Sequence, residues 1–191
     1  MRQRFMLGTT AVIAGALMSL AVASAVAHEG AKAKHPDKHF LKEAAQGGQA
    51  EVTLGQMAAK QAANDDVKKF GQRMVDDHTK ASDELKKLAA SQGVTLPTEM
   101  DRKAKAVQQR LSQLSGAEFD RAYMKEMVKD HQKDVAAFER EARQGNDPDL
   151  KNWAAQTLPT LKEHLDLAQN TAEKVGAKVS AKSELSAKKA M

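Results

Sequence analysis

The chain of 191 residues contains no cysteine, and aromatic residues make up only 4% of it. The absence of cysteine excludes disulfides, thiolate metal ligands and cysteine nucleophiles. We find no run with the alternating, β-branched pattern that favours a strand. Alanine, lysine, glutamine, glutamate and leucine, which favour helices, are abundant instead. The composition therefore predicts an all-α protein whose stability comes from packing.

Several catalytic and binding signatures are also missing. The sequence has no serine nucleophile motif, no glycine-rich phosphate loop and no pair of carboxylates placed for acid–base work, so an enzymatic function is disfavoured. The formal net charge is only +5, and without residues 1–27, which hold two arginines and no acidic residue, it falls to +3. So small a surplus does not indicate a nucleic-acid partner.

Residues 1–27 have the pattern of a secretory signal peptide. Arg2 and Arg4 precede an apolar run that starts at Phe5, and Ala25-Val26-Ala27 forms a small-x-small cleavage site. The run is too short and wrongly flanked for a lasting membrane span. We therefore expect a periplasmic or secreted protein, with no transmembrane span after cleavage. Residues 28–36 lack an apolar period and are expected to form a disordered leader.

The remaining chain predicts four long helices and one short accessory helix, in a bundle over 37–176. Capping residues and glycines set the expected limits of these helices. The first helix starts near Asp37, the second runs from Asn64 to Gly93, and the short helix covers roughly 99–113. A capping box at 115–118 opens the next helix, which ends at Gly145, and the last helix runs from Asp147-Pro148 to Gly176. Pro159 lies inside the last helix and is expected to kink it. Residues 177–191 are expected to form a flexible basic tail able to make weak surface contacts.

Each long helix carries one polar residue near its midpoint, on the face with its apolar residues. These residues are Glu51, His78, His131 and His164. Helix midpoints stay at the same height whichever way the helices run, so we expect one polar layer in the core. Such a layer could bind one transition metal ion, with zinc, iron, manganese and copper all compatible. Alternatively, it could be a buried hydrogen-bond network without metal.

Other polar and sulfur-containing residues lie near the two central histidines. Met74 and Met127 precede them by four residues and could supply thioether ligands to copper(I), although they could equally fill the core. Asp77 and Asp130 lie about 100° around their helices from the neighbouring histidines and are expected to reach adjacent helices or solvent. Asp134 is the better candidate for a carboxylate that supports a histidine ligand.

The leader suggests a second, independent metal site. Cleavage after Ala27 would make His28 the first residue, so that its α-amine and imidazole could chelate copper(II) together. His35 and His39 lie close enough along the chain to join them. A histidine that follows the cleavage site by chance is the alternative.

Three segments together carry a family resemblance. The long segment that ends in RMVDDHTKASDELKKLA, then FDRAYMKEMVKDHQ, then LPTLKEHL, resembles the bacterial family catalogued as domain of unknown function 4142 over about residues 38–175. The resemblance implies an exported protein with a ferritin-like fold, but no established activity. The positions that match the family pattern are Glu51, Asp77, His78, His131, Pro159 and His164.

The chain departs from ferritin-like di-iron proteins, which carry Glu-x-x-His on two of their helices. The residues three positions before the histidines are Val75, Val128 and Leu161. Without these carboxylates, ferroxidase chemistry is disfavoured. Two functions remain open: a metal-binding or metal-handling bundle, and a structural or stress-protective protein that interacts through its surface.

Overall fold

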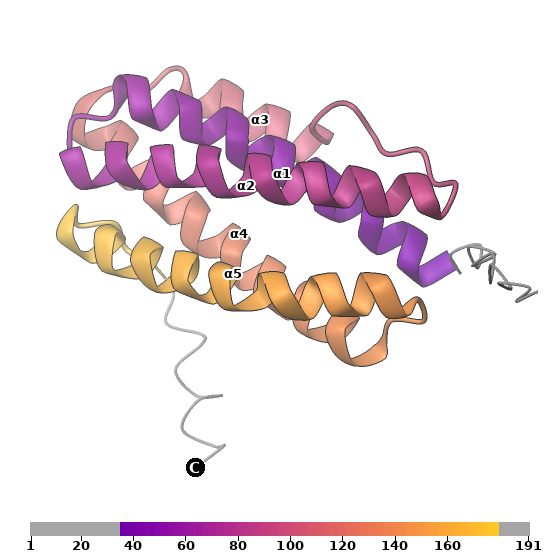
Figure 1. The fold of residues 1–191 in the computed structure, drawn as a ribbon. Coiled ribbons are helices and arrows are strands. Elements are labelled where there is room, and N and C mark those ends of the chain that lie inside the picture. Colours follow the sequence, from indigo (N-terminus) through magenta and orange to yellow (C-terminus); the bar gives the residue numbers. More distant parts are fainter. Residues whose placement is uncertain (1–34, 180–191) are drawn as a thin grey trace, which may run out of the picture.

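Five α-helices form the part of the chain that the computed structural model describes, residues 35–179 (Figure 1). Their bounds are α1 His35–Gln61, α2 Asp65–Ser91, α3 Arg102–Leu111, α4 Gly116–Gln144 and α5 Pro148–Lys174. The predicted all-α architecture of four long helices and one short helix is confirmed. The expectations for residues 1–34, including a copper site at His28, and for residues 180–191 of the tail lie outside the described residues.

The long helices pair as two antiparallel hairpins. α1 packs along α2, and α4 packs along α5, with fewer contacts between the two pairs (Figure 1). The short α3 contacts α1 and α4. None of the described helices is long and apolar enough to cross a membrane.

α1 begins at His35, inside the segment predicted to be a disordered leader. Near its start, Asp37 is buried and accepts hydrogen bonds from the backbone nitrogens of Asn146 and Asp147, both at 3.1 Å. The Asp37 carboxylate therefore ties the beginning of α1 to the turn between α4 and α5. No local sequence pattern marks this tertiary contact.

Most helix ends follow the local capping signals. The side chains of Asn64, Asp101 and Asp147 each accept a hydrogen bond from a backbone nitrogen in the first turn of their helix. Ser115 also precedes its helix, but its side chain makes no capping hydrogen bond, so the predicted capping box is wrong in this respect. Its φ of −145° differs from the −84°, −68° and −81° of the other three caps, and Gly116 follows with a φ of +57°.

Two of the three predicted glycine stops take the left-handed conformation that ends a helix. Gly93 has a φ of +64° and Gly176 a φ of +72°, whereas Gly145 ends α4 with a φ of −55°. Pro159 does not interrupt α5, which runs continuously to Lys174. The proline therefore lies within one helix and does not divide it.

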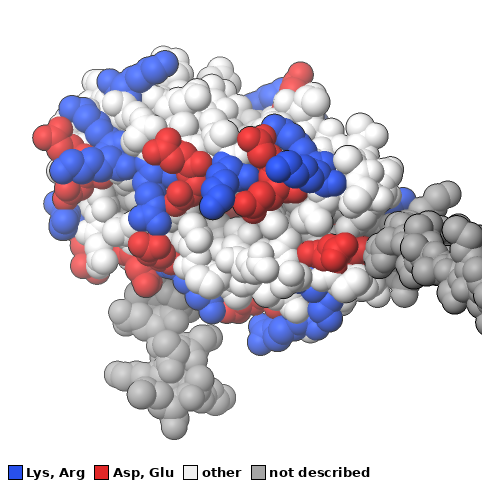
Figure 2. All heavy atoms as spheres, viewed as in Figure 1, with Lys and Arg blue, Asp and Glu red and all other residues white. Residues whose placement is uncertain are grey.

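The surface over α2 and α5 mixes charges of both signs (Figure 2). Ion pairs join the two helices at two places: Arg73 to Glu163 at 3.0 Å and Lys174 to Asp66 at 2.8 Å. Exposed pairs of this kind contribute about 0–1 kcal/mol each. They supplement the packing between the two hairpins.

Two apolar clusters fill the core, one toward each end of the bundle. One cluster contains Val67, Phe70 and Met74 of α2 and the first half of α4; the other contains Leu85 of α2 and Phe138 of α4. Along α2, the buried His78 lies between the members of the two clusters, and His131 does so along α4. The polar residues thus form a layer between two apolar regions.

The contact between α1 and α2 is closest at two glycines. A Cβ atom placed on Gly55 would lie 2.6 Å from the carbonyl oxygen of Gly71, and one placed on Gly71 would lie 2.7 Å from the carbonyl oxygen of Gly55. The two backbones therefore touch where these residues meet.

We expect Gly55→Ala to lower the free energy of unfolding by roughly 1–3 kcal/mol, because the new methyl group would force the two backbones apart. Gly47→Ala is the matched control, since its Cβ would meet its nearest neighbour, Asp134 Oδ2, at an ordinary 3.8 Å. Alanine is favoured over glycine in a helix by about 1 kcal/mol, so this variant should be as stable as wild type or more stable. Urea denaturation measures both, and equal stability of the two variants would contradict the close contact.

Candidate metal centre

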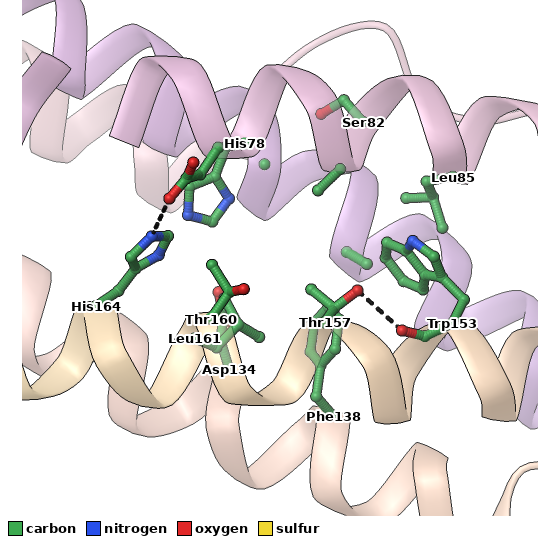
Figure 3. A pocket seen from close by; sticks show the side chains of 14 residues that line it. His78, Ser82, Leu85, Asp134, Phe138, Trp153, Thr157, Thr160, Leu161 and His164 are labelled. Carbon is green, nitrogen blue, oxygen red and sulfur yellow. Dashed lines mark hydrogen bonds and ion pairs between the residues drawn. The ribbon is translucent and has the colours of Figure 1, made fainter. Parts of the chain in front are cut away.

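Three histidines from three helices meet in the polar layer. His78 of α2, His131 of α4 and His164 of α5 each offer one ring nitrogen within 4.8 Å of the other two. Their side chains are buried, and their ring centroids are 5.4 to 5.9 Å apart. Figure 3 shows the rings of His78 and His164 facing each other across the space between α2 and α5.

The hydrogen bond of His131 determines which of its nitrogens carries the proton. Its Nδ1 lies 2.9 Å from the carbonyl oxygen of Met127, one turn earlier on α4. A carbonyl oxygen can only accept, so Nδ1 must donate, and the lone pair is on Nε2. Nε2 is buried and has no hydrogen-bond partner in residues 35–179.

His164 is held in the opposite tautomer. Its Nε2 lies 2.7 Å from Asp77 Oδ2, drawn as a dashed line in Figure 3. Burial alone would raise the pKa of Asp77, but hydrogen bonds from Arg73 and His164 lower it below its usual value, so Asp77 is ionised and accepts. Nε2 of His164 therefore donates, and the lone pair lies on its buried Nδ1, which has no protein partner.

Arg73 completes this arrangement and was not identified from the sequence. Its Nε donates to Asp77 at 2.6 Å, one turn along α2, and its guanidinium also pairs with Glu163. Arg73 and Asp77 are four residues apart, a helical ion-pair spacing that could have signalled the contact. Asp77 thus supports a histidine across the helix pair, the role that the sequence analysis gave to Asp134.

All three imidazoles are kept neutral by their surroundings. Burial, together with His131 and His164, lowers the pKa of His78 to about 3. Burial and His164 lower that of His131 to about 4. Burial also lowers the pKa of His164, against the opposing effect of Asp77. Near neutral pH the three rings therefore carry lone pairs and no charge, as metal binding requires.

Glu51 does not join the three histidines as the fourth member of the expected ligand set. Its carboxylate is fully buried, and Oε1 lies 3.6 Å from Nδ1 of His131, the nitrogen that donates to Met127. Burial raises the pKa of Glu51 well above its usual value, as do the nearby carboxylates of Asp130 and Asp134. Glu51 therefore belongs to a carboxyl group cluster on the α1–α4 side of His131.

Asp130 and Asp134 are the other members of this cluster. Burial raises the pKa of Asp130. Burial and the adjacent Asp130 raise that of Asp134 to about 7. Asp130 also raises the pKa of Glu51, so its carboxyl group lies close to α1. Such a cluster holds protons that a nearby positive charge can release.

Both methionines lie in the apolar core. Met74 and Met127 are almost fully buried and belong to the cluster around Phe70 and Tyr123. Met127 contributes to the polar layer through its backbone carbonyl. These contacts match the packing role that the sequence analysis left open.

Replacing Glu51 with glutamine tests whether the folded protein raises the pKa of this carboxyl group. Because its pKa is raised in the folded protein, the stability from its bound proton is present below the unfolded value near 4.5 and is lost as the pH rises. A glutamine side chain cannot ionise, so the stability of Glu51→Gln relative to wild type should increase as the pH rises above about 4.5. Urea denaturation of metal-free protein measures this difference, with the exposed Glu173→Gln as control; a difference that falls with pH would contradict a raised pKa.

Comparisons with known proteins add the family and the fold. A search of the curated proteins finds no match. The chain is similar in structure to a DUF305 fragment from Deinococcus radiodurans, with a TM-score of 0.67 and 13% identity over 75% of this chain and 99% of that one. It is also similar to a proposed spore coat protein from Bacillus halodurans C-125, with a TM-score of 0.63 and 11% identity over 78% of this chain and 94% of that one.

At these identities the two structures establish a shared helical fold alone. The sequence comparison is more specific. The family described as a domain of unknown function (DUF4142) matches residues 21–171, a span that contains all three histidines and Glu51. The chain therefore belongs to the DUF4142 family.

Proposed function

We propose that the protein binds one transition metal ion through Nε2 of His78, Nε2 of His131 and Nδ1 of His164. The observation that carries the proposal is the grouping of these three buried nitrogens, each without a hydrogen-bond partner among the described residues. The second nitrogen of His131 is fixed by a carbonyl, and that of His164 by a carboxylate. Partners of this kind orient metal-binding histidines and set their tautomers.

A hydrogen-bond network accounts for this arrangement less well. His131 and His164 both present lone pairs, and two acceptors cannot bond to each other. His78 could donate one hydrogen to one of them, which would leave the other without a protein donor. Each unsatisfied buried group costs about 1–3 kcal/mol. A metal ion accepts all three lone pairs at once.

The ligand chemistry narrows the choice of metal. Three neutral imidazoles suit zinc, copper and iron(II), whereas manganese prefers oxygen ligands. Asp77 supplies negative charge beside His164, and the carboxyl cluster of Glu51, Asp130 and Asp134 can release protons when a cation binds. A mononuclear site for zinc, copper or iron(II) fits this set.

The proposal places metal binding outside the cytoplasm, in the periplasm or the secreted state. Residues 1–27 support export, because they contain two arginines, an apolar run and a small-x-small cleavage site in that order. A ferritin-like ancestry of the bundle is part of the same proposal. In that case the protein uses a bundle core for a histidine site in place of a di-iron centre.

His131→Ala should abolish stoichiometric binding of zinc or copper, because it removes one of three ligands. Metal analysis of the untagged protein measures the stoichiometry, and the metal-dependent rise in melting temperature should disappear with it. His39→Ala is the matched control, since His39 is exposed and pairs with Glu43. It should bind zinc as wild type does.

Circular dichroism verifies that the His131 variant stays helical. His78→Ala is a second variant that lacks one of the proposed ligands. Unchanged stoichiometry in both ligand variants would refute the site. Absence of metal binding by wild type would instead favour the hydrogen-bonded layer of a structural protein.

Asp77→Asn should weaken metal binding by roughly 10–100-fold, because it removes the charge that orients and polarises His164. The control is Asp76→Asn, whose carboxylate accepts a hydrogen bond from Gln72 on the exposed side of α2. Isothermal titration with zinc compares the two variants. Equal losses of zinc affinity in both variants would indicate a general surface-charge effect and would contradict a role of Asp77 in supporting His164.

A further inference from the structure

A cavity adjoins the three-histidine group between α2 and α5. Its volume is about 40 Å³, and His78 and His164 border it at one end while Leu85 and Trp153 border it at the other (Figure 3). The cavity therefore extends from two of the three proposed ligands along the inside of the helix pair.

The sides of this cavity reach the surface. Ala81 and Ser82 on α2, and Thr157 and Thr160 on α5, line it and are only partly buried. The Thr157 hydroxyl already donates to the carbonyl oxygen of Trp153 at 2.8 Å. Small side chains thus leave a passage from the surface toward His78 and His164.

The size of the cavity limits what it can hold. One water molecule needs about 10–15 Å³ of such volume, so 40 Å³ accommodates about two or three water-sized groups. A molecule of up to three non-hydrogen atoms fits, whereas an amino acid or a sugar does not.

The neighbouring side chains do not fill the position beside the histidines. Glu51 faces Nδ1 of His131, and Met74 packs in the apolar cluster. Asp134 also borders the cavity, but its Oδ2 lies 3.8 Å from the Cβ position of Gly47, so its carboxylate points toward α1. Three protein ligands leave one position of a tetrahedral metal for an outside ligand.

We propose that this cavity admits a small outside donor, of one to three non-hydrogen atoms, to the metal held by His78, His131 and His164. The inference rests on the proposed metal site and adds a ligand-binding function to it. A structural metal site is closed by protein ligands, whereas a site with a bordering cavity can exchange its remaining ligand. Water would occupy this position until a stronger donor replaces it.

Azide is a suitable probe because it has three atoms and its charge-transfer absorption on copper(II) reports direct coordination. We expect copper(II)-loaded protein to show a new, saturable absorption band on titration with azide. Ala81→Val adds two methyl groups to the cavity wall, so it should bind copper as wild type does but azide at least ~10-fold more weakly. Ala136→Val, the same substitution at an exposed position of α4, should leave both affinities unchanged.

Thr160→Leu narrows the cavity from α5 and provides a second variant should Ala81→Val lose its helicity. Stoichiometric copper binding without an azide band would overturn this inference and leave the proposed metal site intact. The same would follow if azide bound the cavity variants as tightly as wild type. Failure of wild type to bind copper or zinc would overturn the metal site and this inference together.

Discussion

The polar layer depends on how hydrogen bonds fix two buried histidine tautomers. The Met127 carbonyl accepts a hydrogen bond from the protonated nitrogen of His131, and Asp77 accepts one from the protonated nitrogen of His164. The lone pairs consequently lie on buried nitrogens that have no hydrogen-bond partner within residues 35–179. In an apolar core this is costly, and the cost is removed when a single cation accepts the lone pairs. The proposed function follows from this constraint.

The rest of the bundle holds these rings at the required separation. Apolar clusters lie on both sides of the layer, so each histidine is packed from above and below along its helix. The touching backbones at Gly55 and Gly71 bring α1 and α2 together, and Asp37 ties α1 to the turn between α4 and α5. The space left between α2 and α5 becomes the cavity beside His78 and His164.

Local sequence signals were sufficient to predict the helices and the height of the polar residues. Caps such as Asn64 and Asp147 act on their own first turn, and the 3.6-residue period places His78, His131 and His164 on the inward faces. The exceptions have nonlocal or conformational causes. Asp37 of α1 bonds to the distant turn between α4 and α5, and the hydroxyl of Ser115 makes no capping bond before Gly116.

By itself, the sequence determined which residues share one level of the core, because helical period and rise are local properties. Only the tertiary structure decided which of them meet. The rotation of each helix brings three imidazoles together and turns Glu51 toward Asp130 and Asp134. It also brings Asp77 to His164 across 87 residues of chain. These contacts depend on helix packing, in which a rotation of about 100° moves a side chain to a different neighbour.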